Sequence, residues 1–142
     1  MMESSIEKLK RLTDKIVGYE ILRRENLKRI KELFFSLGID KKIETVSELF
    51  EFKAMNLGGI SLSEENFAQI KEGRYVQIIA IVKENERMKN VNLAYFGRSE
   101  KLMEDRKYEI IEFVLRWRLE KSFKNVEHYK ELIEKVPKIE KR

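Results

Sequence analysis

The sequence predicts an α+β domain, in which a long N-terminal helix and C-terminal helices cover a small mixed β-sheet of about four strands. Two observations predict this class: apolar residues recur every three or four positions near both ends, and β-branched and aromatic residues gather in the middle. A chain of 142 residues suits one domain with a real core. We therefore expect a single domain over 1–142, with a long helix over 5–37, a β-rich core over 48–97 and C-terminal helices over 99–136.

The N-terminal helix is predicted from an apolar stripe that runs from Ile6 to Leu37. Ser4 or Ser5 can cap its start, and Gly38 suits the position just beyond its last turn. The stripe indicates a helix that packs on the core. Because the opposite face is heavily charged, a helix that joins two copies of the chain as a homodimer is the alternative.

The first strand is predicted where Phe50 and Phe52 alternate with Glu51 and Lys53. A helix is the competing interpretation, since residues 45–48 fit a capping box. We favour the strand, because side chains two residues apart share one side of a strand but lie on nearly opposite sides of a helix.

The following segment contains several breaks. Residues 56–59 predict a turn, residues 60–62 a short strand, and residues 63–73 a short helix. We expect Phe67 and Ile70 to form the buried side of that helix.

The clearest strand covers residues 75–82, which are apolar on both faces and therefore typical of a central, doubly covered strand. A charged turn over 84–90 leads to another strand over 91–96. Two C-terminal helices are expected after it, the first capped by Ser99 and the second by Asn125.

The composition narrows the protein class. Charged residues make up 39% of the chain, which resembles the ion-pair-rich composition of thermophile proteins. The chain has no Cys, which excludes disulfides and Cys-based zinc sites. It has neither an apolar run long enough for a membrane helix nor a signal-peptide pattern, so we expect a cytoplasmic protein without membrane contact.

Several catalytic motifs can be set aside. His128 is the one histidine, which excludes zinc sites of the HExxH kind, and we expect it to be an ordinary surface residue. Gly58 and Gly59 alone do not make a phosphate-binding loop.

Carboxylate and lysine chemistry remains. On the predicted strand, Glu51 and Lys53 project from one face, and Asp40 lies eleven residues before Glu51. Carboxylate oxygens suit Mg²⁺ or Mn²⁺, and a neighbouring Lys can position water or stabilise phosphate charge. The spacing alone is weak, because an acid-x-Lys pattern occurs three times, about as often as chance expects at this composition.

Residues 49–82, from Leu-Phe-Glu-Phe-Lys-Ala to the apolar strand after Gly-Arg-Tyr, resemble the core of the PD-(D/E)XK, or restriction-endonuclease-like, superfamily, most closely its Mrr-type members. With Gly-Ile-Asp at 38–40, the resemblance spans about residues 38–83. It implies a Mg²⁺-dependent DNA nuclease in which Asp40 and Glu51 bind metal and Lys53 orients the attacking water. A helical Glu, Glu20 or Glu25, would complete the site.

This sequence departs from the family pattern in its short connector between Asp40 and Glu51. A relative that binds nucleic acid without cleaving it is therefore the alternative.

A basic stretch supports nucleic acid as the partner, with DNA favoured over RNA by the resemblance. Residues 74–98 carry five basic and two acidic residues, with Tyr75, Tyr95 and Phe96 interleaved. Lys and Arg can contact phosphates while exposed aromatic side chains stack on bases, although solvation alone explains the charges equally well. The candidate nucleic-acid-binding residues are Arg74, Lys83, Arg87, Lys89, Arg98 and Lys101.

Overall fold

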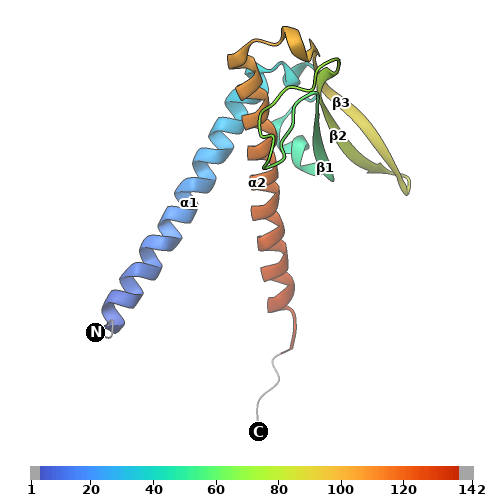
Figure 1. Ribbon diagram of the computed structural model, residues 1–142. Coiled ribbons are helices and arrows are strands. Elements are labelled where there is room, and N and C mark those ends of the chain that lie inside the picture. Colours follow the sequence, from blue (N-terminus) through green and yellow to red (C-terminus); the bar gives the residue numbers. More distant parts are fainter. Residues whose placement is uncertain (1–3, 138–142) are drawn as a thin grey trace.

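The computed structural model describes residues 4–137, with the backbone alone for residues 12–17; the ends of the predicted domain, 1–3 and 138–142, lie outside the described residues. Two long helices and a three-stranded antiparallel sheet make up the fold (Figure 1). The predicted α+β class is confirmed. The sheet has three strands rather than about four, and it is antiparallel rather than mixed.

Helix α1 spans Ser5–Ser36, close to its predicted bounds. The Ser4 hydroxyl accepts a hydrogen bond from the Glu7 amide, and the Glu7 carboxylate accepts one from the Ser4 amide, which completes a capping box. Beyond the C-cap, Gly38 has φ +75°, a left-handed conformation that glycine adopts without steric cost. Both predicted ends of the helix are confirmed.

The sheet contains β1 (Ala54–Gly58), β2 (Tyr75–Glu84) and β3 (Arg87–Arg98) in the order β1-β2-β3. Strand β2 is central, as predicted, but only one of its faces is covered. Val76, Ile78 and Ala80 are buried, whereas the alternate residues are half-buried or exposed. Helices cover one side of the sheet and leave the other side open.

The strand predicted around Phe50 and Phe52 is wrong. Residues Val46–Glu51 form a 3₁₀ helix, η2, and β1 begins only at Ala54, so the predicted turn over 56–59 lies mostly inside a strand. The carbonyls of this segment explain the difference. The indole of Trp117 donates to the Leu49 carbonyl at 2.8 Å, and the Lys121 ammonium donates to the Phe50 carbonyl, so these groups bond to side chains instead of to a neighbouring strand.

The segment between β1 and β2 has no helix, so the short helix predicted over 63–73 is also wrong. Ala68 has φ +66°, which is incompatible with a right-handed helix. Ile60 and Ile70 form an isolated β-bridge in place of the predicted short strand. Phe67 and Ile70, predicted to be buried, are 51% and 39% exposed.

The C-terminal half differs from the prediction in its boundaries. Strand β3 begins at Arg87, so the charged turn is shorter than predicted. Ser99 opens a 3₁₀ helix, η3 (Ser99–Lys101), instead of capping a long helix. Helix α2 (Glu104–Glu134) then runs without interruption, so the break predicted at Asn125 does not exist. No Gly or Pro lies within these 31 residues to end the helix.

The core lies where the inner face of the sheet meets the second half of α1 and the first half of α2. Its largest buried side chains include Phe34, Met55, Ile78 and Phe113. Arg23 of α1 is paired with the buried Glu120 of α2. Toward the chain ends the two helices diverge and extend beyond the core (Figure 1).

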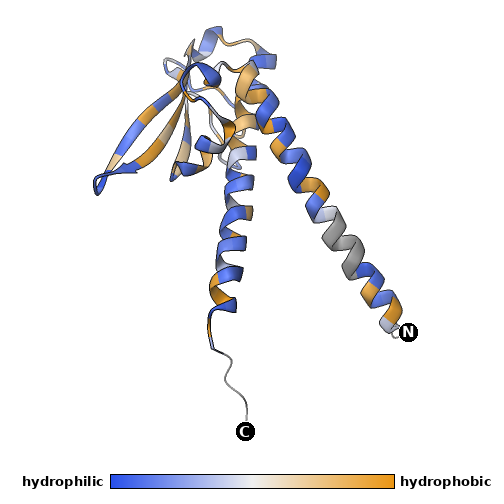
Figure 2. Cartoon of the chain, turned by 180° about the vertical axis from the view of Figure 1, so that it is seen from behind, coloured by the Kyte–Doolittle hydropathy of each residue, from blue (hydrophilic) through white to orange (hydrophobic). Residues whose placement is uncertain are grey.

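Where Figure 2 colours them by hydropathy, the projecting parts of both helices are largely hydrophilic with separate hydrophobic patches. Neither described helix carries an apolar stretch that could span a lipid bilayer.

Candidate nucleic-acid interface

The open face of the sheet presents two exposed aromatic side chains side by side. Tyr75 of β2 pairs with Arg98 of β3, and Gln77 pairs with Tyr95, so these four side chains share one face. Tyr75 is 51% and Tyr95 is 59% exposed, and their ring centroids are 5.9 Å apart. Below them, Gln77 accepts a hydrogen bond of 2.7 Å from Asn92. The face therefore combines flat apolar rings with polar edges.

The predicted nucleic-acid-binding residues are all exposed, but the structure separates them into two groups. Arg74 and Arg98 lie at the Tyr75 end of the sheet, and Lys101 follows directly in η3. The other three, Lys83, Arg87 and Lys89, lie at the tip of the β2–β3 hairpin.

At the strand rise of about 3.3 Å per residue, the length of β2 places the two groups about 30 Å apart. At the tip, Lys89 forms an ion pair of 3.7 Å with Glu84, which offsets part of that charge. Phe96 packs against the core and offers no ring for stacking.

Beside the tyrosines the surface is hollowed by about 570 Å³. Arg74, Lys71 and Tyr75 line this hollow together with the backbone of Gly59. Gly59 has φ +84°, and a Cβ there would come within 2.6 Å of the Tyr75 carbonyl oxygen. Only glycine fits this close approach, which fixes the loop against the start of β2.

The three predicted catalytic residues are not presented as the sequence suggested. Asp40 is exposed in the 3₁₀ helix η1 (Ile39–Lys41), and Glu51 is the exposed last residue of η2. Lys53 follows η2 just before β1 begins. The expectation that Glu51 and Lys53 share one face of a strand is wrong, because residues 49–53 form no strand. Glu20 and Glu25, the helical candidates, are exposed on α1.

The described side chains do not bring these residues together as a metal site with three protein ligands. Among the side chains that the structure describes, which leave out residues 12–17, no group of three or more His, Asp or Glu lies within reach of a single ion. Lys53 also lies close enough to Lys121 for its positive charge to lower the pKa of that lysine, and positive charge of this kind repels a cation. We therefore derive no catalytic step through a metal, and metal binding by Asp40 and Glu51 stays a prediction.

Sequence reasoning missed a second basic site, which we call the cationic hollow. It measures about 280 Å³ and lies between β1 and α2. Its lining consists of Lys53, Ala54, Met55, Asn56, Trp117, Arg118, Lys121, Ser122 and Asn125. Arg118, Lys121 and Asn125 follow helical spacing, so the helix face was visible in the sequence, but its approach to Lys53 depends on the tertiary fold.

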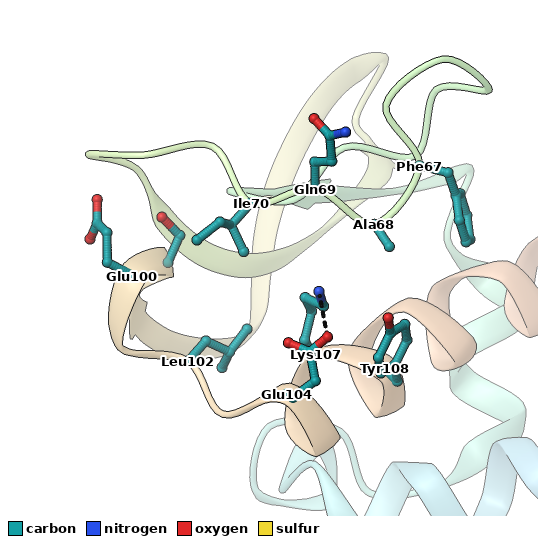
Figure 3. A pocket seen from close by; sticks show the side chains of 10 residues that line it. Phe67, Ala68, Gln69, Ile70, Glu100, Leu102, Glu104, Lys107 and Tyr108 are labelled. Atoms are coloured by element: carbon teal, nitrogen blue, oxygen red, sulfur yellow. Dashed lines mark ion pairs between the residues drawn. The ribbon is translucent and has the colours of Figure 1, made fainter.

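A third concavity, the loop hollow, lies between residues 67–70 and the start of α2 and measures about 500 Å³ (Figure 3). Lys107 points into it and forms an ion pair of 3.1 Å with Glu104. Glu100 also lines it, and a hydrogen bond from the Gly73 amide lowers the pKa of the Glu100 carboxyl. Two carboxylates against one lysine suit an anionic ligand poorly.

The predicted surface position of His128 is confirmed: its side chain is exposed, with Tyr129 beside it.

Comparisons of the chain with protein-family models, with curated proteins and with solved structures found no match. The resemblance to the PD-(D/E)XK superfamily therefore stays a prediction, and a proposal about function depends on the geometry of the sites themselves.

Proposed function

We propose that the protein binds single-stranded nucleic acid across the open face of its sheet, without cleaving it. The observation that carries the proposal is the exposed pair of Tyr75 and Tyr95 beside Arg98, on the face that the helices leave uncovered. Aromatic rings on an open sheet stack on unpaired bases, while neighbouring arginines contact phosphates.

The distribution of charge agrees with an extended ligand. Basic residues lie at both ends of the face, about 30 Å apart by the rise of the strand. A strand of several nucleotides can cross the tyrosines and contact cations at either end. A duplex hides the faces of its bases, so stacking on the tyrosines selects for single strands.

Binding can be measured by fluorescence anisotropy with labelled single-stranded DNA, single-stranded RNA and duplex DNA. The double variant Tyr75→Ala/Tyr95→Ala should weaken single-strand binding at least tenfold, because stacking contributes roughly 1–3 kcal/mol per base. Tyr129→Ala, which removes an exposed tyrosine of α2, is the matched control and should bind as the wild type does. Affinity should fall steeply with salt. Absent or salt-insensitive binding contradicts the proposal.

The same samples test catalysis. We expect no cleavage of DNA with Mg²⁺ or Mn²⁺, because the described side chains include no cluster of three or more carboxylates that could hold a metal ion. Cleavage that needs the metal and disappears in both Glu51→Ala and Lys53→Ala would instead support the nuclease hypothesis.

A second candidate function is self-association through the projecting helices. Ile6 of α1 is 80% exposed and Ile133 of α2 is 69% exposed. Residues 8–15 carry four basic residues and one acidic residue, whereas residues 127–134 carry three acidic residues and one basic residue. Glu127 pairs with Arg23 of its own chain. Glu131 and Glu134 still leave the α2 end of one copy complementary in charge to the basic α1 end of another.

Light scattering at increasing protein concentration tests this second candidate. We expect a homodimer that Ile133→Lys converts to a monomer, because a lysine in an apolar contact must be desolvated. A wild-type protein that stays monomeric at high concentration would exclude it.

A further inference from the structure

The cationic hollow gathers positive charge without any carboxylate. Lys53, Arg118 and Lys121 line it, and Lys124 lies close enough for its charge to lower the pKa of Lys121. Among the nine lining residues, all within the described part of the chain, none is Asp or Glu. Glu120, the neighbour of Lys121 in sequence, is buried and bonded to Arg23 instead. Strand β1, which contributes Ala54, Met55 and Asn56 to the lining, is an edge strand of the sheet (Figure 1).

Two arginines elsewhere on the helices, Arg29 and Arg116, are neutralised by one carboxylate. Arg29 of α1 makes two hydrogen bonds of 3.0 Å to the carboxylate of Glu112. Arg116 donates to the same carboxylate at 2.7 Å. A chain with 25 acidic residues thus places carboxylates beside these arginines and leaves the hollow without one.

Neutral groups hold the cations of the hollow in place. Arg118 donates to the Met55 carbonyl at 3.0 Å, and Lys121 donates to the Phe50 carbonyl. The Lys121 ammonium also lies 5.8 Å from the centre of the Trp117 ring. Carbonyls and rings orient a cation without cancelling its net charge, so the field in the hollow stays positive.

This arrangement carries a cost in the free protein. Burial lowers the pKa of Lys121, and the positive charges of Lys53 and Lys124 lower it further. A bound anion would relieve the repulsion and favour the charged lysine, so the cost is recovered when the site is filled.

We propose that the cationic hollow binds a phosphate group. Arg118 offers paired N–H donors that match phosphate oxygens, and Lys121 and Lys53 add compact positive charges. Asn56, Ser122 and Asn125 line the same space and supply neutral hydrogen-bonding groups. The hollow shares neither tyrosine of the open face, so this proposal does not depend on the proposed single-strand binding.

The site contains its own reporter, because Trp117 is the one tryptophan of the chain and lines the hollow. Inorganic phosphate and pyrophosphate are titrated into the intact protein while KCl keeps the ionic strength constant, and tryptophan emission is recorded. We expect a saturable change that is stronger for pyrophosphate. Lys121→Met should weaken binding at least tenfold, and Lys121→Arg should restore most of it.

Two further variants serve as an independent test of the site and as a control. Arg118→Gln should also weaken binding, and it tests the site independently if Lys121→Met changes the fold. Lys130→Met removes an exposed lysine of α2 away from the hollow and should leave the titration unchanged. The double tyrosine variant of the open face should respond to phosphate as the wild type does, which separates this site from the first.

The source of the phosphate is identified with single-stranded oligonucleotides that carry or lack a 5′-phosphate. A response to the free anions indicates a small phosphate ligand. A response only to oligonucleotides, lost in Lys121→Met, indicates a nucleic-acid backbone, and dependence on the 5′-phosphate indicates a strand end. The proposal is overturned if no probe gives a saturable change, or if Lys121→Met and Arg118→Gln bind as the wild type does.

Discussion

Two hollows along helix α2 contain lysines in opposite surroundings. In the loop hollow at the start of the helix, Lys107 is paired with Glu104 and shares the space with Glu100 (Figure 3). In the cationic hollow further along, Lys121 is bonded to a carbonyl and surrounded by other cations. The residue type and the helix are the same, but the charge around the lysine has the opposite sign.

This contrast distinguishes Lys107, whose charge is used within the fold, from Lys121, whose charge is available to a ligand. Acidic residues in the first turn of a helix are stabilising, because they lie near the positive end of its dipole, so Glu104 and Asp105 serve α2 itself. Lys107 then neutralises the carboxylate of Glu104. Lys121 and Arg118 bond backbone carbonyls, which leaves their positive charge without a carboxylate partner in the hollow, and this is why we propose an anion for that hollow.

Truncation of one aromatic lining residue in each hollow should give the largest difference in the free energy of unfolding. Trp117 is buried, donates to the Leu49 carbonyl and stacks on Phe50, so Trp117→Ala should lower the free energy of unfolding by about 3–5 kcal/mol. Tyr108 of the loop hollow is half exposed, and Tyr108→Ala should cost less than about 1 kcal/mol. Urea denaturation measures both. Equal losses in the free energy of unfolding would show that Trp117 and Tyr108 do not differ in burial as described.

The core position of Trp117 could be read from the apolar periodicity of its helix, as could α1 with both caps and the central strand β2. In these elements local propensity and the tertiary fold agree. Residues 49–53 show the opposite case. Their alternation predicts a strand, but Trp117 and Lys121, more than sixty residues away, bind the carbonyls that a strand would have paired.

The candidate sites also divide into features that the local sequence predicts and features that depend on tertiary contacts. The sequence indicated that basic residues and Tyr75 and Tyr95 occur together, but which aromatic side chains stay exposed depends on which face the helices cover, and Phe96 is directed to the core. The placement of Lys53 also depended on a strand that does not form. The cationic hollow joins residues 53–56 to residues 117–125, a contact that spacing alone cannot predict.

The second largest difference in the free energy of unfolding is expected between two carboxylates that form ion pairs. Glu112 accepts hydrogen bonds from Arg29 and Arg116, and Glu112→Gln should lower the free energy of unfolding at pH 7 by about 1–2 kcal/mol, since the group is partly exposed. Glu104→Gln breaks a single pair with Lys107 in which the carboxylate side chain is 67% exposed, and it should cost less than about 0.5 kcal/mol. Thermal and urea unfolding of both variants provide the comparison.

Acid should remove the effect of Glu112. The hydrogen bond from Arg29, helped by Arg116 and opposed by burial, lowers the pKa of the Glu112 carboxyl below its usual value of 4.5. A lowered folded-state pKa contributes stability that is present above the unfolded pKa and is lost as pH falls through the folded one. The difference between wild type and Glu112→Gln should therefore shrink below about pH 4.5. A difference that stays constant to lower pH would contradict this account.

The smallest expected effect concerns Lys121 at alkaline pH. Its folded-state pKa lies below the usual 10.5, so the unfolded chain binds more protons as pH rises from the folded value toward 10.5. The wild type should therefore gain stability over that window, by less than about 1 kcal/mol for a partly solvated ammonium.

The wild-type curve minus that of Lys121→Met should show this rise. Lys121→Arg stays charged throughout this pH window, so its stability should not rise with pH, as in Lys121→Met. Unlike Lys121→Met, it should still bind phosphate. Saturating phosphate should flatten the rise in the wild type, because the bound anion favours the charged lysine in the folded state. A rise that phosphate leaves unchanged would place the anion away from Lys121, and the contrast between the two hollows would then lose its functional meaning.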